Sequence, residues 1–83
     1  MPRYYIDTSD EDQFVQDDTG YEFADVEEAK HAAVRALPDM AREKLPDGDA
    51  RAFLAIVRGP DGKSLLQASL TLKVTSLIPT TER

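Results

Sequence analysis

The most regular pattern of apolar and polar residues lies late in the chain, where residues 66–75 (LQASLTLKVT) alternate without a break. Strict alternation predicts a β-strand with one face turned to the core. Residues 51–58 (RAFLAIVR) form a second apolar run, and a turn sequence at 59–62 separates the two. These segments predict a β-hairpin with strands over 51–58 and 63–77.

The pattern leaves the register of this hairpin open. In one register the even-numbered apolar residues of the first strand face the core, and the opposite face carries Phe53, Val57 and Leu65. In the register shifted by one residue the sets exchange, which leaves Leu54, Ile56 and Leu65 outside. Both registers place large apolar side chains on both faces of the hairpin.

A helical pattern begins at Asp25, which suits the N-cap position, with Glu28 three residues on as its capping-box partner. The residues expected to face the sheet are Val26, Ala29, Ala33, Ala36, Leu37, Met40 and Lys44. Pro38 falls on the opposite side, where it either bends the helix around the sheet or ends it at Leu37. A turn over 45–49 is expected to follow the helix.

The first quarter of the chain predicts a shorter hairpin, with strands over 3–8 and 13–16 and polar turns at 9–12 and 17–20. The whole pattern is β-β-α-β-β. It predicts a single two-layer α+β domain over 1–83, in which one kinked helix packs on one face of an antiparallel sheet built from two hairpins. Residues 79–83 are expected to form a disordered tail.

One helix covers only one face of such a sheet, so the second face predicts an interface. We therefore expect a small, non-catalytic interaction or regulatory module that works as a homodimer, with another protein as a possible partner. The interface candidates are Phe53, Leu54, Ile56, Val57 and Leu65. The alternative is that the helix or residues 78–79 cover the second face within the chain.

Charge adds a second feature, because the net charge of −6 is unevenly distributed. Residues 1–28 hold ten acidic side chains and one basic one, whereas residues 29–83 hold six acidic and nine basic ones. The two parts can attract each other, within the domain or between copies, or the charges can simply keep exposed loops in solution. An acidic chain without clustered Lys and Arg is not expected to bind nucleic acid.

The chain of 83 residues contains no cysteine, and its start lacks the apolar stretch of a signal peptide. No apolar stretch approaches the roughly 20 residues that span a bilayer. We therefore expect a cytoplasmic protein that does not interact with membranes.

Candidate chemistry is sparse. The only histidine, His31, falls on the charged side of the helix, and no nucleophile or orienting carboxylate is apparent around it. The four glycines are spaced as turns rather than as a phosphate-binding loop, so we expect no cofactor and no enzymatic activity. The alternative function is a small-ligand or divalent-metal site in the acidic hairpin, whose candidate ligands are Asp10, Asp12, Asp17 and Asp18.

Several short sequences also resemble a known family. They are 1–7 (MPRYYID), 17–20 (DDTG), 22–29 (EFADVEEA), 37–39 (LPD) and 60–62 (PDG). Together they resemble a family of short bacterial proteins, found in rhizobia and other alphaproteobacteria, that is catalogued only as a domain of unknown function. The resemblance implies a bacterial cytoplasmic setting, and it carries no activity, cofactor or catalytic residue to this chain.

Overall fold

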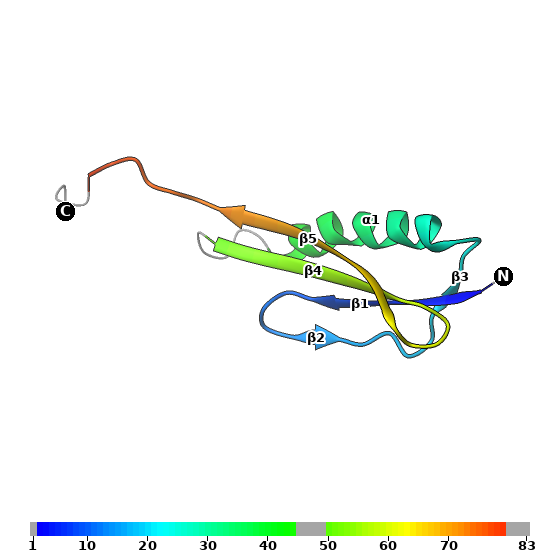
Figure 1. The fold of residues 1–83 in the computed structure, drawn as a ribbon. Coiled ribbons are helices and arrows are strands. Elements are labelled where there is room, and N and C mark those ends of the chain that lie inside the picture. The colour runs from blue at the N-terminus through cyan, green and yellow to red at the C-terminus, as the bar shows by residue number, and fades with distance from the viewer. Residues whose placement is uncertain (1, 45–49, 80–83) are drawn as a thin grey trace.

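The computed structural model describes residues 2–44 and 50–79. Within them, one helix packs on one face of an open antiparallel sheet of five strands, as Figure 1 shows. The elements are β1 (Arg3–Ser9), β2 (Phe14–Val15), β3 (Tyr21–Glu22), α1 (Val26–Lys44), β4 (Ala50–Arg58) and β5 (Ser64–Lys73). The predicted α+β class is confirmed.

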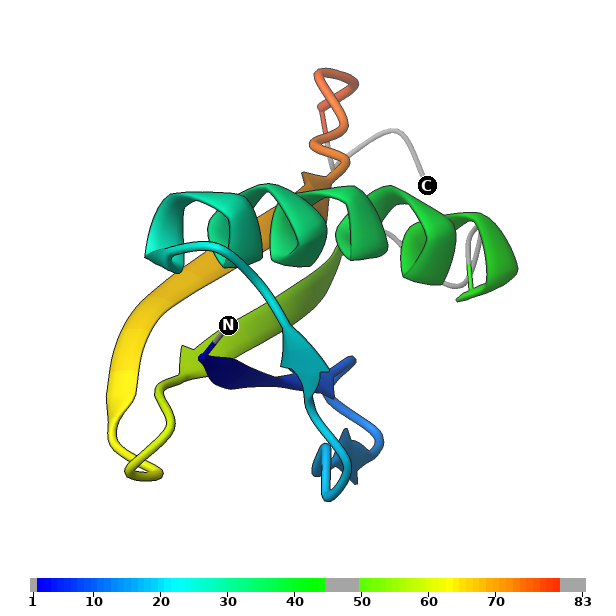
Figure 2. The same cartoon turned by 90° about the vertical axis from the view of Figure 1, so that its right-hand side faces the viewer.

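The strand order β2-β1-β4-β5, which the sequence left open, joins the two hairpins through β1 and β4. These strands pair antiparallel, with Ile6 opposite Val57 and Ser9 opposite Leu54. The short strand β3 pairs with the start of β1, where Tyr21 lies opposite Tyr4. The first and last parts of the chain therefore meet in the middle of the sheet, and β5 forms one margin of it (Figure 2).

The structure selects the second of the two predicted hairpin registers. Phe53 lies opposite Leu70 and Val57 opposite Leu66, and these side chains share the face that α1 covers. The pairing then shifts, because Arg58 lies opposite Ser64 and one residue of β5 has no direct partner. This irregularity puts the odd-numbered residues of β4 in the core, so the first register is wrong.

The helix begins as predicted. The N–H of Glu28 donates to Asp25 Oδ1 at 3.0 Å, and Glu28 Oε1 in turn accepts from the N–H of Ala24 at 3.0 Å. The helix continues through Pro38, which is exposed, so the alternative in which it ends at Leu37 is wrong. The turn predicted over 45–49 lies outside the described residues.

The core is small and lies between α1 and the central strands. Its buried apolar residues are Tyr4, Ala29, Ala33, Leu37, Ala41, Phe53, Ala55 and Val57. The buried helix positions, Ala29, Ala33, Leu37 and Ala41, recur every four residues, and the three small alanines let α1 approach β4 closely. Of the residues predicted to face the sheet, Val26 and Lys44 lie exposed at the two ends of the helix, whereas Ala41 was missed.

Two boundaries differ from the sequence prediction. The prediction had no strand at β3, which has only two residues. It also carried the last strand to residue 77, whereas β5 ends at Lys73, where its pairing with β4 ends at Ala50. Residues 74–79, called the β5 extension below, continue away from the sheet (Figure 1). Most of the predicted tail at 79–83 lies outside the described residues.

Candidate functional site

An ion pair on the second face of the sheet joins β1 to β4. Asp7, only 5% exposed, accepts hydrogen bonds from Arg58 Nε (2.8 Å, to Oδ2) and Nη2 (3.1 Å, to Oδ1). The guanidinium also lies 4.8 Å from the centre of the Tyr5 ring. The hydrogen bond from Arg58 lowers the pKa of Asp7 against the opposing effect of burial, and Asp7 in turn raises the pKa of Arg58. Both groups are therefore held in their charged forms.

Asp17 extends this network along the edge of β1. Its Oδ2 accepts from the N–H of Ile6 at 3.1 Å, and its Oδ1 accepts from the N–H groups of Thr19 (3.1 Å) and Gly20 (2.9 Å). Its own N–H donates to Asp7 Oδ1 at 2.9 Å. Burial raises the pKa of Asp17, but these N–H donors outweigh it and the net shift is downward. The Asp17 carboxylate thus takes the place of a neighbouring strand beside Ile6.

The turn at the end of β1 uses its acidic residues in the same way. Asp10 Oδ1 accepts from the N–H groups of Asp12 (3.1 Å) and Gln13 (3.0 Å), while Asp10 Oδ2 lies 3.6 Å from Lys44 Nζ. Asp12 Oδ2 accepts from Arg51 Nη2 at 2.7 Å. Burial opposes ionisation of Asp10, but these donors and Lys44 together lower its pKa. Lys44 and Arg51, from the more basic later part of the chain, thus bind aspartates of the acidic first part. The predicted attraction between the two parts occurs within one domain.

This arrangement bears directly on the predicted metal ligands. Asp10 and Asp12 face basic side chains, Asp17 is turned toward backbone N–H groups, and Asp18 is exposed. Over residues 2–44 and 50–79, no group of three or more His, Asp and Glu side chains is placed to hold a metal ion. The four aspartates do not form one shared site.

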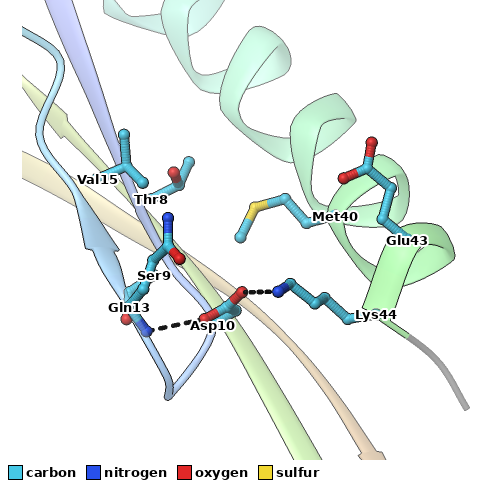
Figure 3. A pocket seen from close by; sticks show the side chains of 8 residues that line it. All are labelled: Thr8, Ser9, Asp10, Gln13, Val15, Met40, Glu43 and Lys44. Carbon is cyan, nitrogen blue, oxygen red and sulfur yellow. Dashed lines mark hydrogen bonds and ion pairs between the residues drawn. The ribbon is translucent and has the colours of Figure 1, made fainter. Parts of the chain in front are cut away.

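A cleft of about 250 Å³ lies between the end of α1 and the first hairpin (Figure 3). Met40 projects into it from the helix, and the Asp10–Lys44 ion pair closes one end. The lining residues are Thr8, Ser9, Asp10, Gln13, Val15, Met40, Glu43 and Lys44. Thr8 and Ser9 supply its hydroxyl groups, and no histidine is among its lining residues. His31 itself is exposed, with Nε2 3.9 Å from Glu27 Oε2.

A second hollow, of about 370 Å³, lies nearer the start of the helix. It is lined by Ile6, Thr8, Tyr21, Phe23, Ala32 and Ala36. These residues supply no charged group, so this hollow has the character of an apolar groove between α1 and the β1 side of the sheet.

The five interface candidates divide between the two faces of the sheet. Phe53 and Val57 are completely buried beneath α1, because the observed register turns them inward, so they are not available on the surface. Leu54 and Ile56 lie on the second face and are partly exposed, and Leu65 is 50% exposed.

Sequence reasoning missed two features of the second face. Phe14, which is 59% exposed, lies in register with Ser9 and Leu54 across three strands. Asp7 and Arg58 were not recognised as a pair, although their positions on alternating strands put both on the face opposite the core. The alternation shows the face, but only the β1–β4 register shows that they are neighbours.

Comparison with known proteins adds a family but no activity. A family model described as "Domain of unknown function (DUF6894)" matches residues 3–71. No curated protein and no solved structure matches the chain. Among residues 2–44 and 50–79, no helix combines the length and the apolar character needed to cross a membrane.

Proposed function

We propose that this chain, which belongs to the DUF6894 family of domains of unknown function, is a non-catalytic protein-interaction module that works as a homodimer through the second face of its sheet. The family supplies no substrate, partner or reaction, so the proposal rests on the molecule alone.

The observation that carries the proposal is that the fold has a single helical layer, on one face of the sheet. Among the described residues α1 covers one face of the sheet, and no element covers the other (Figure 1). That second face carries Leu54 and Ile56 at its centre, with Phe14 and Leu65 exposed around them. Apolar side chains gathered on an uncovered sheet face are typical of a protein interface.

The alternative cover within the chain finds no support. The helix lies on the opposite face, and the β5 extension runs away from the sheet rather than back across it. Leu77 and Ile78 in this extension are 93% and 67% exposed, so they do not shield the second face.

A non-catalytic role is supported by how the charged groups are used. Asp7, Asp10 and Asp17 each accept two or more hydrogen bonds from the chain itself and are held ionised. A general acid or base needs a pKa near the working pH, and these shifts go the other way. The carboxylates act as structural acceptors that hold loops and strands together.

The test uses adjacent residues of β2 that face opposite ways. Phe14 (59% exposed) is in register with Ser9 on the second face, whereas Val15 (49% exposed) is in register with Thr8 on the helix side. We expect Phe14→Glu and Leu54→Glu to lower the solution mass measured by light scattering over a concentration series. A charge left in an apolar contact costs at least about 2 kcal/mol, or about thirty-fold in Kd.

The Val15→Glu variant is the control, since it adds the same charge at a similar exposure on the other side. Its mass should match that of the wild type. Circular dichroism should show all three variants folded. Equal masses for wild type, Phe14→Glu and Leu54→Glu would remove the second face as the contact.

A further inference from the structure

The outer edge of β5 is open for pairing. Among residues 2–44 and 50–79, β5 has a neighbour in the sheet on one side only, and its ten residues include one charged residue, Lys73, and no proline. Natural edge strands usually carry charges, prolines or bulges that prevent pairing with another chain. The one register shift, between Val57 and Arg58, falls at the start of the strand, so the rest of the edge is regular.

The β5 extension prolongs this edge. Val74, Leu77 and Ile78 are 55%, 93% and 67% exposed. Within this segment the N–H of Ile78 donates locally to Ser76 Oγ at 3.2 Å. Three exposed apolar side chains on this segment indicate a surface that another chain covers.

Exposed apolar side chains flank this edge near its start and on the helix face, whereas Gln67, Ser69, Thr71 and Lys73 make the second face of β5 polar. Leu65 is 50% exposed on the second face, and Leu70 is 39% exposed on the helix face. Val34 on α1 is 46% exposed. Ala32 lines the groove beside β1, so that side of α1 faces β1. Helix positions advance 100° per residue, which puts Val34 on the opposite flank of the helix. Val34 therefore lies on the side of α1 nearer β5. A strand added at this edge would contact all three side chains.

We infer that β5 and its extension pair antiparallel with the same segment of a second copy, about a two-fold axis at Thr71. Main-chain hydrogen bonds would then join the two sheets into one, with both helices on the same side. Residues 64–78 supply both strands of this pair. The second copy therefore offers a strand of the same length as the open edge, with apolar side chains that can lie opposite those of the edge.

The register follows from the side chains. Directly opposed residues of antiparallel strands project to the same face, and side chains alternate between faces along each strand. In a symmetric pair, one residue must therefore lie directly opposite its own copy, with the two-fold axis midway between them. An axis at Thr71 places Leu65 opposite Leu77, Leu70 opposite Leu72 and Lys73 opposite a serine. Of the possible positions of the axis along β5, only Thr71 places Leu77 opposite an apolar residue of β5. An axis at Lys73 would oppose two like charges.

This edge contact goes beyond the proposed function, because it uses a different surface from the sheet face. A chain that used one of the two contacts would form dimers, and a chain that used both would form tetramers or larger assemblies. Experiments on the edge are therefore best made in the Leu54→Glu variant as well as in the wild type, because that substitution leaves the edge intact.

Cysteine cross-linking tests the axis directly, since the chain has no cysteine of its own. Thr71→Cys should form a disulfide-linked dimer on mild oxidation, because the two sulfurs meet at the axis. Gln67→Cys is the control on the same strand and face, also exposed, and its copies would lie about 26 Å apart, beyond disulfide reach. A mixture of Gln67→Cys and Thr75→Cys should cross-link, whereas each alone should not.

A charge exchange at the axis provides a second readout that does not depend on thiol geometry. Thr71→Lys and Thr71→Glu should each lose edge association by light scattering, and an equal mixture of the two should regain it. Two results together support the inference: Thr71→Cys cross-links in the wild type and in the Leu54→Glu variant, and the mixture of Thr71→Lys and Thr71→Glu associates again. Equal cross-linking of Thr71→Cys and Gln67→Cys, or a mixture no larger than its parts, would overturn it.

The outcomes separate the two proposals. If Leu54→Glu lowers the mass but Thr71→Cys does not cross-link, the sheet-face homodimer stands and the edge contact is wrong. If Thr71→Cys cross-links equally well with and without Leu54→Glu, and that substitution does not change the mass, the edge is the contact and the sheet face is not.

Discussion

The Asp7–Arg58 pair offers the sharpest test of what holds the sheet together. The Asp7 carboxylate accepts hydrogen bonds from Arg58 Nε and Nη2 and from the N–H of Asp17, and replacing Asp7 by Asn removes its negative charge. Breaking a buried ion pair by removing one partner costs about 3–5 kcal/mol. The Arg58 side chain is 19% exposed and keeps the Asp17 carbonyl as an acceptor, so we expect the lower end, about 3 kcal/mol.

That loss is large for this chain. A stability of about 0.05–0.15 kcal/mol per residue gives about 4–12 kcal/mol for the whole domain. We expect Arg58→Met to destabilise the domain as well, because it leaves Asp7 buried without its cation. The double variant should lose less than the sum of the two, since neither group is then left unpaired. The expected coupling energy is about 2 kcal/mol.

The assay is urea unfolding of the four proteins at one fixed protein concentration, so that any self-association affects them alike. Circular dichroism is the suitable signal because the chain has no tryptophan. A coupling energy below about 0.5 kcal/mol, as found for exposed ion pairs, would refute the reasoning and make the pair a surface contact. Equal urea m-values across the cycle serve as the check that all four proteins unfold the same structure.

Three further predictions concern the backbone, the core and pH. Gly20→Ala should destabilise the domain by more than Gly62→Ala in thermal unfolding, because both glycines have positive φ but only at Gly20 would a Cβ lie 2.9 Å from a backbone oxygen; equal losses would mean that φ alone matters. Phe53→Ala should cost about 3–5 kcal/mol, enough to unfold much of the protein at 37 °C, and a near-neutral result in urea titration would contradict the assigned register. The pKa values of Asp7 and Asp17 are lowered in the folded state, so their stabilisation is complete above the usual value near 3.8 and disappears as pH falls through the lowered values. Acid titration followed by circular dichroism should therefore show stability falling below about pH 4, and Asp7→Asn should flatten that fall.

Most of the fold could be read from local patterns. The capping residues Asp25 and Glu28 fixed the start of α1, and the alternation over 66–75 identified β5, although that strand stops at Lys73. The last described pair of this hairpin is Lys73 with Ala50, and a strand end set by pairing with a distant residue cannot be read from the local pattern of β5. The register of the β4–β5 hairpin was equally out of reach, since both faces of β4 are apolar and the single-residue shift beside Arg58 decides between them.

The candidate site was less predictable because its geometry depends on distant pairing. The acidic residues were correctly seen as a cluster in the sequence, but their partners Arg51 and Arg58 come about 40 and 50 residues later. Only the β1–β4 register brings them together. The metal interpretation treated the carboxylates as free ligands, whereas Asp17 faces the backbone of Ile6 and Gly20.

The central pairing of β1 with β4 has a consequence for how the chain folds. Tyr5 and Arg58 are direct neighbours in the sheet although α1 and both short strands lie between them in the chain. Closing so long a loop costs entropy before any contact repays it, so the sheet should assemble after the helix and the β4–β5 hairpin have formed. The Asp7–Arg58 link would then be absent from the folding transition state and act as a brake on unfolding, setting the lifetime of the native chain more than the speed with which it forms.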